Sequence, residues 1–218
     1  MNTLTSSYLQ HRYMILFYSL LCSIIAVPLF STLRIGAALP FLFAFNLLAA
    51  IVPIASARVK TVLLAMLFVI LLIQLQRNTL QGLQASIGSL TIWTFVGLFA
   101  AIYSLRFTLK ASEIHGEHIY AALSAYLLAG VFLGHFFWVL ERIAPGSLLI
   151  GGAKMNGNFP ISAAIYFSFV TLATLGYGDI VPASDVARAV AIVEAVAGQL
   201  YLAVMVARLV SLYAVRKQ

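Results

Sequence analysis

The chain has 218 residues, of which 63% are hydrophobic and 9% are charged, and its mean hydropathy is +1.04. This composition excludes an ordinary soluble domain and predicts an integral membrane protein. The formal net charge of +7 does not predict a nucleic-acid partner, because the basic residues stand singly between apolar runs, as they do in the loops of membrane proteins.

The first half of the chain predicts four membrane helices. A helix needs about 20 apolar residues to cross the hydrocarbon core of a bilayer. The runs that approach this length are residues 13–30, 35–54, 61–75 and 89–105. Pro40 and Pro53 are expected to kink or end the second helix, because proline lacks a backbone donor. The first run is not followed by a small-residue cleavage site, so we expect a retained helix and not a signal peptide.

The second half predicts two more spanning helices with a shorter helix between them. Residues 119–141 and 185–215 are long enough to span, and Ser184 or Asp185 is the expected N-cap of the latter. The apolar part of residues 160–173 is too short to span, which indicates a re-entrant half-helix starting near Pro160. Backbone that enters a membrane without crossing it must be buried in protein or line a water-filled path. The predicted fold is therefore an all-α membrane protein with six spanning helices and one re-entrant segment.

The basic residues favour one orientation in the membrane. With the N-terminus inside, the cytoplasmic group is Arg12, Arg58, Lys60, Arg106, Lys110, Arg216 and Lys217. The outer group is Arg34, Arg77, Arg142, Lys154 and Arg188. This mild excess follows the positive-inside rule and predicts that both termini are cytoplasmic. We expect a multi-pass protein of a plasma (cell inner) membrane, and the compact chain is typical of bacteria.

Residues 171–179, Thr-Leu-Ala-Thr-Leu-Gly-Tyr-Gly-Asp, carry a specific chemistry. Backbone carbonyls arranged around an axis can replace the water of a dehydrated ion. Such a row needs a backbone that alternates between ordinary and positive φ, which Gly176 and Gly178 adopt without a Cβ penalty. The alternative interpretation is a tight glycine-rich turn that has this sequence by coincidence.

This motif and its surroundings resemble the pore domain of tetrameric potassium channels. The motif departs from the family's commonest filter only by Leu175 in place of Val. Further matches are Tyr166-Phe167-Ser168 in the half-helix, Pro182 after the motif and Gly198 in the last helix. The resemblance covers residues 119–218, nearly half of the chain.

The resemblance implies a domain organisation and an assembly. Residues 1–118 would form an N-terminal four-helix membrane module, and residues 119–218 a pore domain. The parts of that domain would be an outer helix (119–141), a pore helix (160–173), a filter (174–179) and an inner helix (185–215). A homotetramer is implied, because one chain carries one filter and the family's pore needs four.

The resemblance also assigns roles within the filter. Potassium would bind the backbone carbonyls of Thr174, Leu175, Gly176 and Tyr177, together with the Thr174 hydroxyl, and Gly178 completes the filter. Asp179 would place a negative charge at the outer mouth. The aromatic pair Tyr166-Phe167 would pack around the filter, and the Tyr177 ring would point outward as a strut.

The N-terminal module lacks the charges of a voltage sensor. Residues 89–105 contain no basic side chain, and Arg106 and Lys110 follow only at the predicted cytoplasmic end. Moving one charge through 100 mV is worth about 2.3 kcal/mol, and sensors carry several arginines. We therefore expect no steep voltage gating. A scaffold, a lipid-facing collar and a sensor of another kind remain open as roles for these four helices.

The filter's support differs from that of some family members. They carry a glutamate where this chain has Val170, and that glutamate bonds to the filter's terminal aspartate. Two alternatives follow for Tyr166: it supplies a hydroxyl to Asp179 instead, or it only takes part in aromatic packing.

The predicted inner helix contains two polar residues and an apolar series. Glu194 precedes Gly198 by one turn, so both lie near one face. Glu194 either supports the pore helix through Ser168 or Thr171, which we favour, or enriches cations near the cavity. By resemblance Gly198 is the hinge and Gln199 faces the water-filled cavity. The apolar series would form a constriction or pack ordinarily, and its members are Leu202, Val206 and Val210.

Other titratable residues offer weaker hypotheses. His135 could sense external pH, but a hydrogen bond to a neighbour is the commoner role. His115 and His118, with Glu113 and Glu117, are spaced like a metal site, although we favour a solvated helix. The lone Cys22 excludes a disulfide within one chain.

The sequence thus predicts a passive potassium-selective channel that needs no cofactor. No nucleophile–base pair, zinc motif or phosphate loop indicates an enzyme. The expected partners are K⁺ ions, the lipid bilayer and further copies of the chain, with an unidentified regulatory subunit left open. The alternatives are the membrane subunit of a potassium uptake transporter, a non-selective cation channel and a non-conducting partner subunit.

Overall fold

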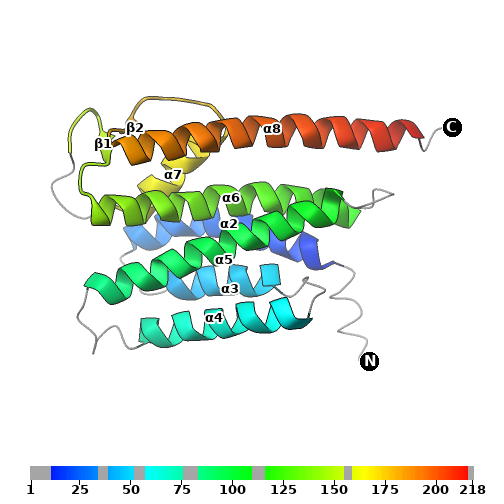
Figure 1. The fold of residues 1–218 in the computed structure, drawn as a ribbon, viewed down its shortest axis with the longest axis horizontal. Helices are drawn as coiled ribbons and strands as arrows, with labels where there is room; N and C mark the ends of the chain where they lie inside the picture. Colours follow the sequence, from blue (N-terminus) through cyan, green and yellow to red (C-terminus); the bar gives the residue numbers. More distant parts are fainter. Residues whose placement is uncertain are drawn as a thin grey trace. The chain divides into compact units, whose positions relative to one another are not determined.

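The computed structural model describes residues 11–33, 39–51, 57–75, 83–109, 116–154 and 159–215. The elements follow in the order α2 (Arg12–Thr32), α3 (Leu39–Ile51), α4 (Ala57–Leu75), α5 (Leu83–Leu109), α6 (Gly116–Ile143), β1 (Leu148–Ile150), α7 (Ile161–Leu172), β2 (Ile180–Pro182) and α8 (Asp185–Val215), as Figure 1 shows. The chain forms two compact units, one of residues 1–129 with 212–218 and one of residues 130–211.

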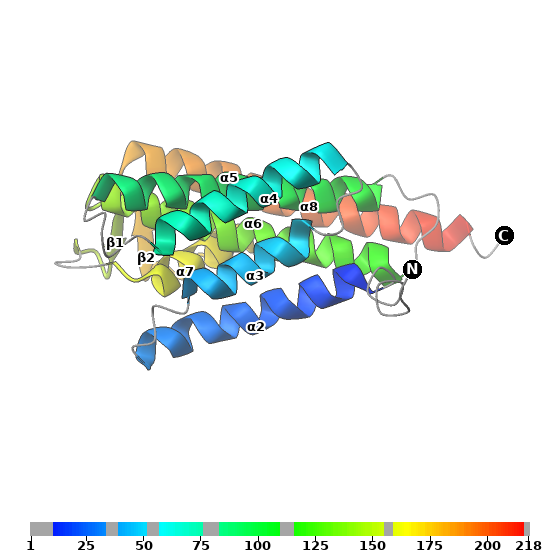
Figure 2. The same ribbon diagram turned by 90° about the horizontal axis from the view of Figure 1, so that it is seen from below.

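The first unit contains α2 to α5 and the beginning of α6. Helix α3 packs against α2 and α4, and α5 packs against α3 and α4, so that helices consecutive in the chain are neighbours (Figure 2). Phe41, Phe68 and Phe95 remain 61–69% exposed on three of these helices. Large apolar side chains pointing outward are expected for helices that face lipid rather than water.

Polar contacts join the helices of the first unit at two places along α2. The Glu117 carboxylate of α6 accepts hydrogen bonds from Tyr13 N (2.8 Å) and Met14 N (3.4 Å) in the first turn of α2. It thereby satisfies donors that the helix itself leaves free, at the end where the dipole favours negative charge. Farther along, the buried Asn46 of α3 donates to Ser23 Oγ of α2 at 2.5 Å.

Three helical stretches of the described residues are long and apolar enough to cross a membrane: Arg12–Phe30, Gly116–Ile143 and Asp185–Arg208. Shorter apolar stretches are Phe41–Ile51, Lys60–Val69, Thr94–Leu109 and Ile161–Leu172. That the chain crosses the membrane six times, and not only with these three stretches, stays a prediction. Helix α5 extends past the expected residues 89–105 at both ends, whereas residues 35–38 and 52–54 of the expected second helix, Pro53 included, lie outside the described ones.

The second unit contains the end of α6, the half-helix α7, α8 and a two-stranded antiparallel sheet. β1 and β2 pair with Leu148 opposite Pro182 and Ile150 opposite Ile180. The described residues are mostly helical, as the predicted all-α fold requires, and this small sheet is an addition that the sequence did not predict. Each strand has three residues, too few to produce a recognisable alternation of apolar and polar side chains. The buried core beside the sheet consists of Phe137, Leu148, Phe159, Ala164, Phe167, Ile180, Ala187 and Ala191.

Candidate ion-conduction site

The start of α7 is set by a proline and by a contact from α6. Pro160 adopts φ −73° and ψ 141° immediately before the helix, where the missing proline N–H costs nothing. Trp138 Nε1 of α6 donates to the carbonyl of Phe159 at 2.8 Å. The half-helix then runs from Ile161 to Leu172, which is too short to cross a membrane.

Two glycines let α6 approach α7 closely. A Cβ added at Gly130 would lie 2.5 Å from the Phe169 ring, and one added at Gly134 would lie 2.6 Å from Ile165 Cα. Glycines four residues apart are the small-xxx-small pattern by which membrane helices pack. This pattern was readable in the sequence, yet sequence analysis did not use it.

The two aromatic side chains of the pair in α7, Tyr166 and Phe167, have different surroundings. Phe167 is buried and meets Phe137 of α6 edge to face, with ring centroids 4.8 Å apart. Tyr166 lies partly exposed, and a hydrogen bond to Asp179 raises the pKa of its hydroxyl above the ordinary value. The direction of this pKa shift agrees with the alternative in which Tyr166 supplies a hydroxyl to Asp179, and that role stays a prediction.

The chain after α7 forms the candidate filter loop, residues 174–179. The angle φ is positive at Thr174 (55°), Gly176 (59°) and Gly178 (78°), and at none of the residues between them. Positive φ therefore alternates with ordinary φ, and it includes a threonine, for which the left-handed region is uncommon. Strain of this kind concentrates at functional sites.

The carbonyls of residues 174–178, which are all those of the candidate filter loop except that of Asp179, have no partners within the described part of the chain. The loop is joined to α7 through Thr174 N, which donates to Thr171 O (2.9 Å), and Leu175 N, which donates to Val170 O (2.8 Å). By contrast, the carbonyl oxygens of residues 174–178 accept no hydrogen bond from any described residue. Such a run of unpaired acceptors requires another partner, such as water or a cation.

The loop is exposed between two buried anchors. Leu175 and Tyr177 are 54% and 66% exposed, whereas Leu172 before the loop and Ile180 after it are buried. An apolar groove of about 530 Å³ lies beside the loop, and its lining includes Val170, Thr174, Gly176, Ile180, Ala191 and Ile192. The loop is therefore held at both ends and presents its middle to the outside of the single chain.

Glu194 lies behind α7 in a fully buried position. Its Oε1 is 2.5 Å from Ser168 Oγ, and Ser168 Oγ is in turn 2.8 Å from the carbonyl oxygen of Gly130. These contacts join α8, α7 and α6. Of the two partners considered for Glu194, the structure brings Ser168 to it, while Thr171 contributes its carbonyl to Thr174.

Gly198 and Gln199 place α8 against the beginning of the candidate filter loop. A Cβ at Gly198 would overlap the carbonyl oxygen of Leu172, so the close approach of α8 to the end of α7 requires a glycine there. Gln199 Nε2 donates to Thr174 Oγ1 at 3.0 Å. Close packing thus accounts for Gly198, and its role as a hinge stays a prediction.

The remaining sequence candidates have ordinary surroundings or fall outside the described residues. Leu202 and Val206 are exposed along α8, and the side chain of Val210 lies outside the described part. His135 is buried, donates from Nδ1 to Val131 O (2.8 Å) and stacks on Phe132. His118 stacks on Phe107, Glu113 and His115 lie outside the described residues, and no cluster of metal-ligating side chains occurs within the described ranges.

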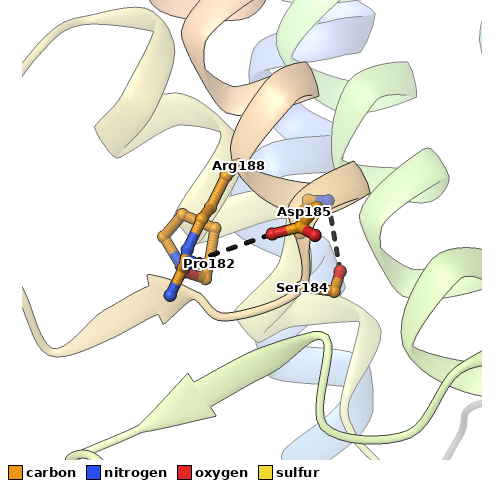
Figure 3. Close-up of polar contacts among 5 residues, drawn as sticks. Pro182, Ser184, Asp185 and Arg188 are labelled. Carbon is orange, nitrogen blue, oxygen red and sulfur yellow. Dashed lines mark hydrogen bonds and ion pairs between the residues drawn. The ribbon is translucent and has the colours of Figure 1, made fainter.

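The N-terminal end of α8 is capped by Ser184 and not by Asp185. Ser184 Oγ accepts a hydrogen bond from Ala187 N at 3.2 Å (Figure 3). Asp185 is fully exposed and lies 3.9 Å from the Arg188 guanidinium, whose Nε donates to Pro182 O at 3.3 Å. Exposed pairs of this kind contribute little to stability.

Comparison with known proteins finds similarity in the second half of the chain. Residues 121–214 match the model of the ion-channel family Ion_trans_2, described as "Ion channel". Over 66 residues the chain is 38% identical to "Two pore potassium channel c" of Oryza sativa subsp. japonica. That match covers 27% of this chain and only 14% of the rice protein. No solved structure matches the chain.

Proposed function

We propose that this chain forms a potassium-selective channel, because residues 121–214 match an ion-channel family model and 66 residues of the chain are 38% identical to a two pore potassium channel. Potassium would pass down its gradient, losing its water to the carbonyls of Thr174, Leu175, Gly176 and Tyr177 and to the Thr174 hydroxyl. Asp179 would lie at the outer mouth. No resident cofactor is required.

The observation that carries this proposal is the backbone of residues 174–178. Successive residues of opposite φ turn consecutive peptide groups, and the carbonyls of this run lack partners among the described residues. Hydrogen-bond acceptors left without donors in a membrane cost several kcal/mol each. A row of bound cations would remove that cost, which is the principle of a carbonyl selectivity filter.

We further propose that the channel is a homotetramer. One chain contributes one candidate filter loop, which cannot surround an ion by itself. The exposed Leu175 and Tyr177 and the adjacent groove offer an apolar surface that a second copy of the chain would cover. The proposal extends to six spanning helices, cytoplasmic termini and a plasma (cell inner) membrane location.

Reversal potentials test the proposed selectivity. The purified protein is reconstituted into planar bilayers with K⁺ on one side and Na⁺ on the other, and its mass in detergent is measured by native mass spectrometry. We expect four copies and a reversal near the potassium equilibrium potential. A reversal near zero would instead support a non-selective cation channel. Absence of current at any voltage would favour a transporter subunit or a chain that needs a partner.

Replacing Tyr177 tests the filter directly. Tyr177→Asp removes the ring that is expected to brace the loop in the assembled channel and adds a charge beside the carbonyls, so K⁺ should lose its advantage over Na⁺. We expect the permeability ratio of K⁺ to Na⁺ to fall toward one while current persists. An unchanged ratio would contradict the assignment of residues 174–178 as the filter.

A further inference from the structure

Glu141 is a buried acidic residue in the last turn of α6 that has no role in the site described above. Glu141 as a whole is only 6% exposed, and its carboxylate is held by main-chain donors at both oxygens. Gly146 N donates to Oε1 at 2.7 Å and Leu148 N donates to Oε2 at 2.8 Å. Hydrogen bonds to a carboxylate are stronger than those between neutral groups. The carboxylate therefore fixes the turn that leads from α6 into β1.

The turn fixed by Glu141 holds the chain that follows the candidate filter loop. Ser147 O accepts hydrogen bonds from Ala183 N (2.8 Å) and Ser184 N (3.3 Å). β1 pairs with β2 along its length, and beyond the pair Gly151 N donates to Asp179 O at 2.9 Å. Residues 179–184 are thus tied to the α6–β1 segment from one end to the other.

The two strands rest on a core shared with α7 and α8. Leu148 and Ile180, the inward side chains of β1 and β2, are buried with Phe167 and Ala187. The loop itself lacks this support, because Gly176, Tyr177 and Gly178 donate and accept no main-chain hydrogen bond among the described residues. The position of the end of the loop at Asp179, its outer end in the proposed channel, is therefore set by β2, which begins at the next residue.

We propose that Glu141 is a positioning residue for the outer end of the candidate filter loop, acting through β1 and β2. The inference rests on the proposed function, since it concerns the selectivity of that loop. Discrimination between ions by carbonyls requires the site to be held within about 0.5 Å. Removing the carboxylate frees two donors of the turn, loosens β1, and allows β2 and Asp179 to shift.

Paired substitutions in the full-length protein test the proposal. Glu141→Ala removes both acceptors, whereas Glu141→Gln keeps one and turns an amide toward the other donor. We expect the K⁺/Na⁺ permeability ratio from reversal potentials to fall in both variants, and further in Glu141→Ala. Asp185→Asn is the matched control: it removes an exposed carboxylate at the start of α8, in the same unit, without touching the turn, so its ratio should equal that of the wild type. Wild-type selectivity in the Glu141 variants would overturn the proposal.

A cross-strand disulfide distinguishes positioning from a general loss of folding. Leu149 and Val181 are opposite each other in the pair, and residues directly opposite in antiparallel strands lie at a separation that a disulfide can bridge. In a Cys22→Ala background, Leu149→Cys and Val181→Cys are combined with Glu141→Ala. Oxidation should restore selectivity, and reduction should remove it again. Failure of the formed disulfide to restore selectivity would overturn the proposed route through the strands.

Hydrogen exchange supplies a readout that does not depend on conduction. The amides of residues 146–151 and 179–184 should exchange faster in Glu141→Gln than in the wild type, while those of α7 should keep their protection. If the amides of these two segments exchange equally fast in Glu141→Gln and in the wild type, the inference is overturned, even if the wild type conducts. A wild type without selective current, but with the expected exchange, would instead contradict the proposed function alone.

Discussion

Ser168 Oγ lies within hydrogen-bond distance of two oxygens, Gly130 O and Glu194 Oε1. A hydroxyl has one proton to donate, and a backbone carbonyl can only accept. Both contacts are therefore satisfied when Glu194 is protonated and donates to Ser168, which donates to Gly130. Glu194 Oε2 has no hydrogen-bond partner among the described residues, and burying it is far less costly in a neutral acid than in a carboxylate.

This arrangement predicts that an amide can replace the acid at position 194. Glu194→Gln keeps a donor toward Ser168, so its K⁺ current should stay close to that of the wild type. Glu194→Ala leaves Ser168 without the donor and opens a cavity, at a cost of about 1–3 kcal/mol for the unpaired group alone. We expect reduced thermal stability and reduced current, measured on the same preparations. If Gln is as damaging as Ala, Glu194 functions as an anion instead.

Tyr166 makes a second prediction at the residue scale. Its hydrogen bond to Asp179 raises the pKa of Tyr166, so the hydroxyl stays protonated and donates at every pH below the ordinary tyrosine value of about 10. The contribution of the bond is lost only as pH rises through the raised pKa. Tyr166→Phe should therefore weaken K⁺ selectivity by a similar factor between pH 6 and pH 9, as followed by reversal potentials. Wild-type selectivity in this variant would leave Tyr166 with a packing role alone.

At the scale of elements, the second unit depends on how closely its helices approach. Gly130 and Gly134 bring α6 onto α7, and Gly198 brings α8 onto the last carbonyl of α7. In lipid the driving force for such contacts is van der Waals packing, which requires small residues at the interface. The half-helix, too short to span, is thus held from two sides, and the candidate filter loop begins where it ends.

Substitution of Gly134 tests this packing. In Gly134→Ala the new Cβ would overlap the backbone of Ile165, and overpacking of this kind costs about 1–3 kcal/mol. We expect a lower midpoint of thermal unfolding in detergent. Gly116→Ala is the control, because a Cβ there meets nothing within 4 Å and alanine favours the helix. Equal stability of the Gly134 and Gly116 variants would contradict the close approach of α6 and α7.

At the scale of the whole molecule, the distribution of charge predicts weak voltage dependence. Helix α5, the fourth in order, carries Arg106 in its last turn and no other basic residue. A single elementary charge crossing the full field changes an equilibrium by about 2.3 kcal/mol per 100 mV, roughly 50-fold. We expect the open probability to change less than this over 100 mV, as measured in bilayers between −100 and +100 mV. A steeper dependence would require gating charges other than Arg106, the one basic residue of α5.

Much of this protein follows from local properties of its sequence. Long apolar runs predict helices because helix formation and membrane insertion depend on neighbouring residues, and α2, α6 and α8 have the length and composition to span. The glycines of the motif predicted the alternating φ because only a residue without a Cβ adopts positive φ freely. The likeness of residues 121–214 to ion channels also rests on this local sequence.

Only the tertiary structure decided which distant residues meet. The register of β1 on β2, the contact of Glu194 with Ser168 rather than Thr171, and the contact of Phe167 with Phe137 join residues of different elements. Glu141 escaped sequence analysis because a carboxylate at a helix end is ordinary until the turn that wraps around it is seen. By itself the sequence determined a membrane protein in which a loop with two glycines follows a half-helix. The packing of α6, α7, α8 and the small sheet determined how that loop is held, because contacts between distant segments leave no periodic pattern in the sequence.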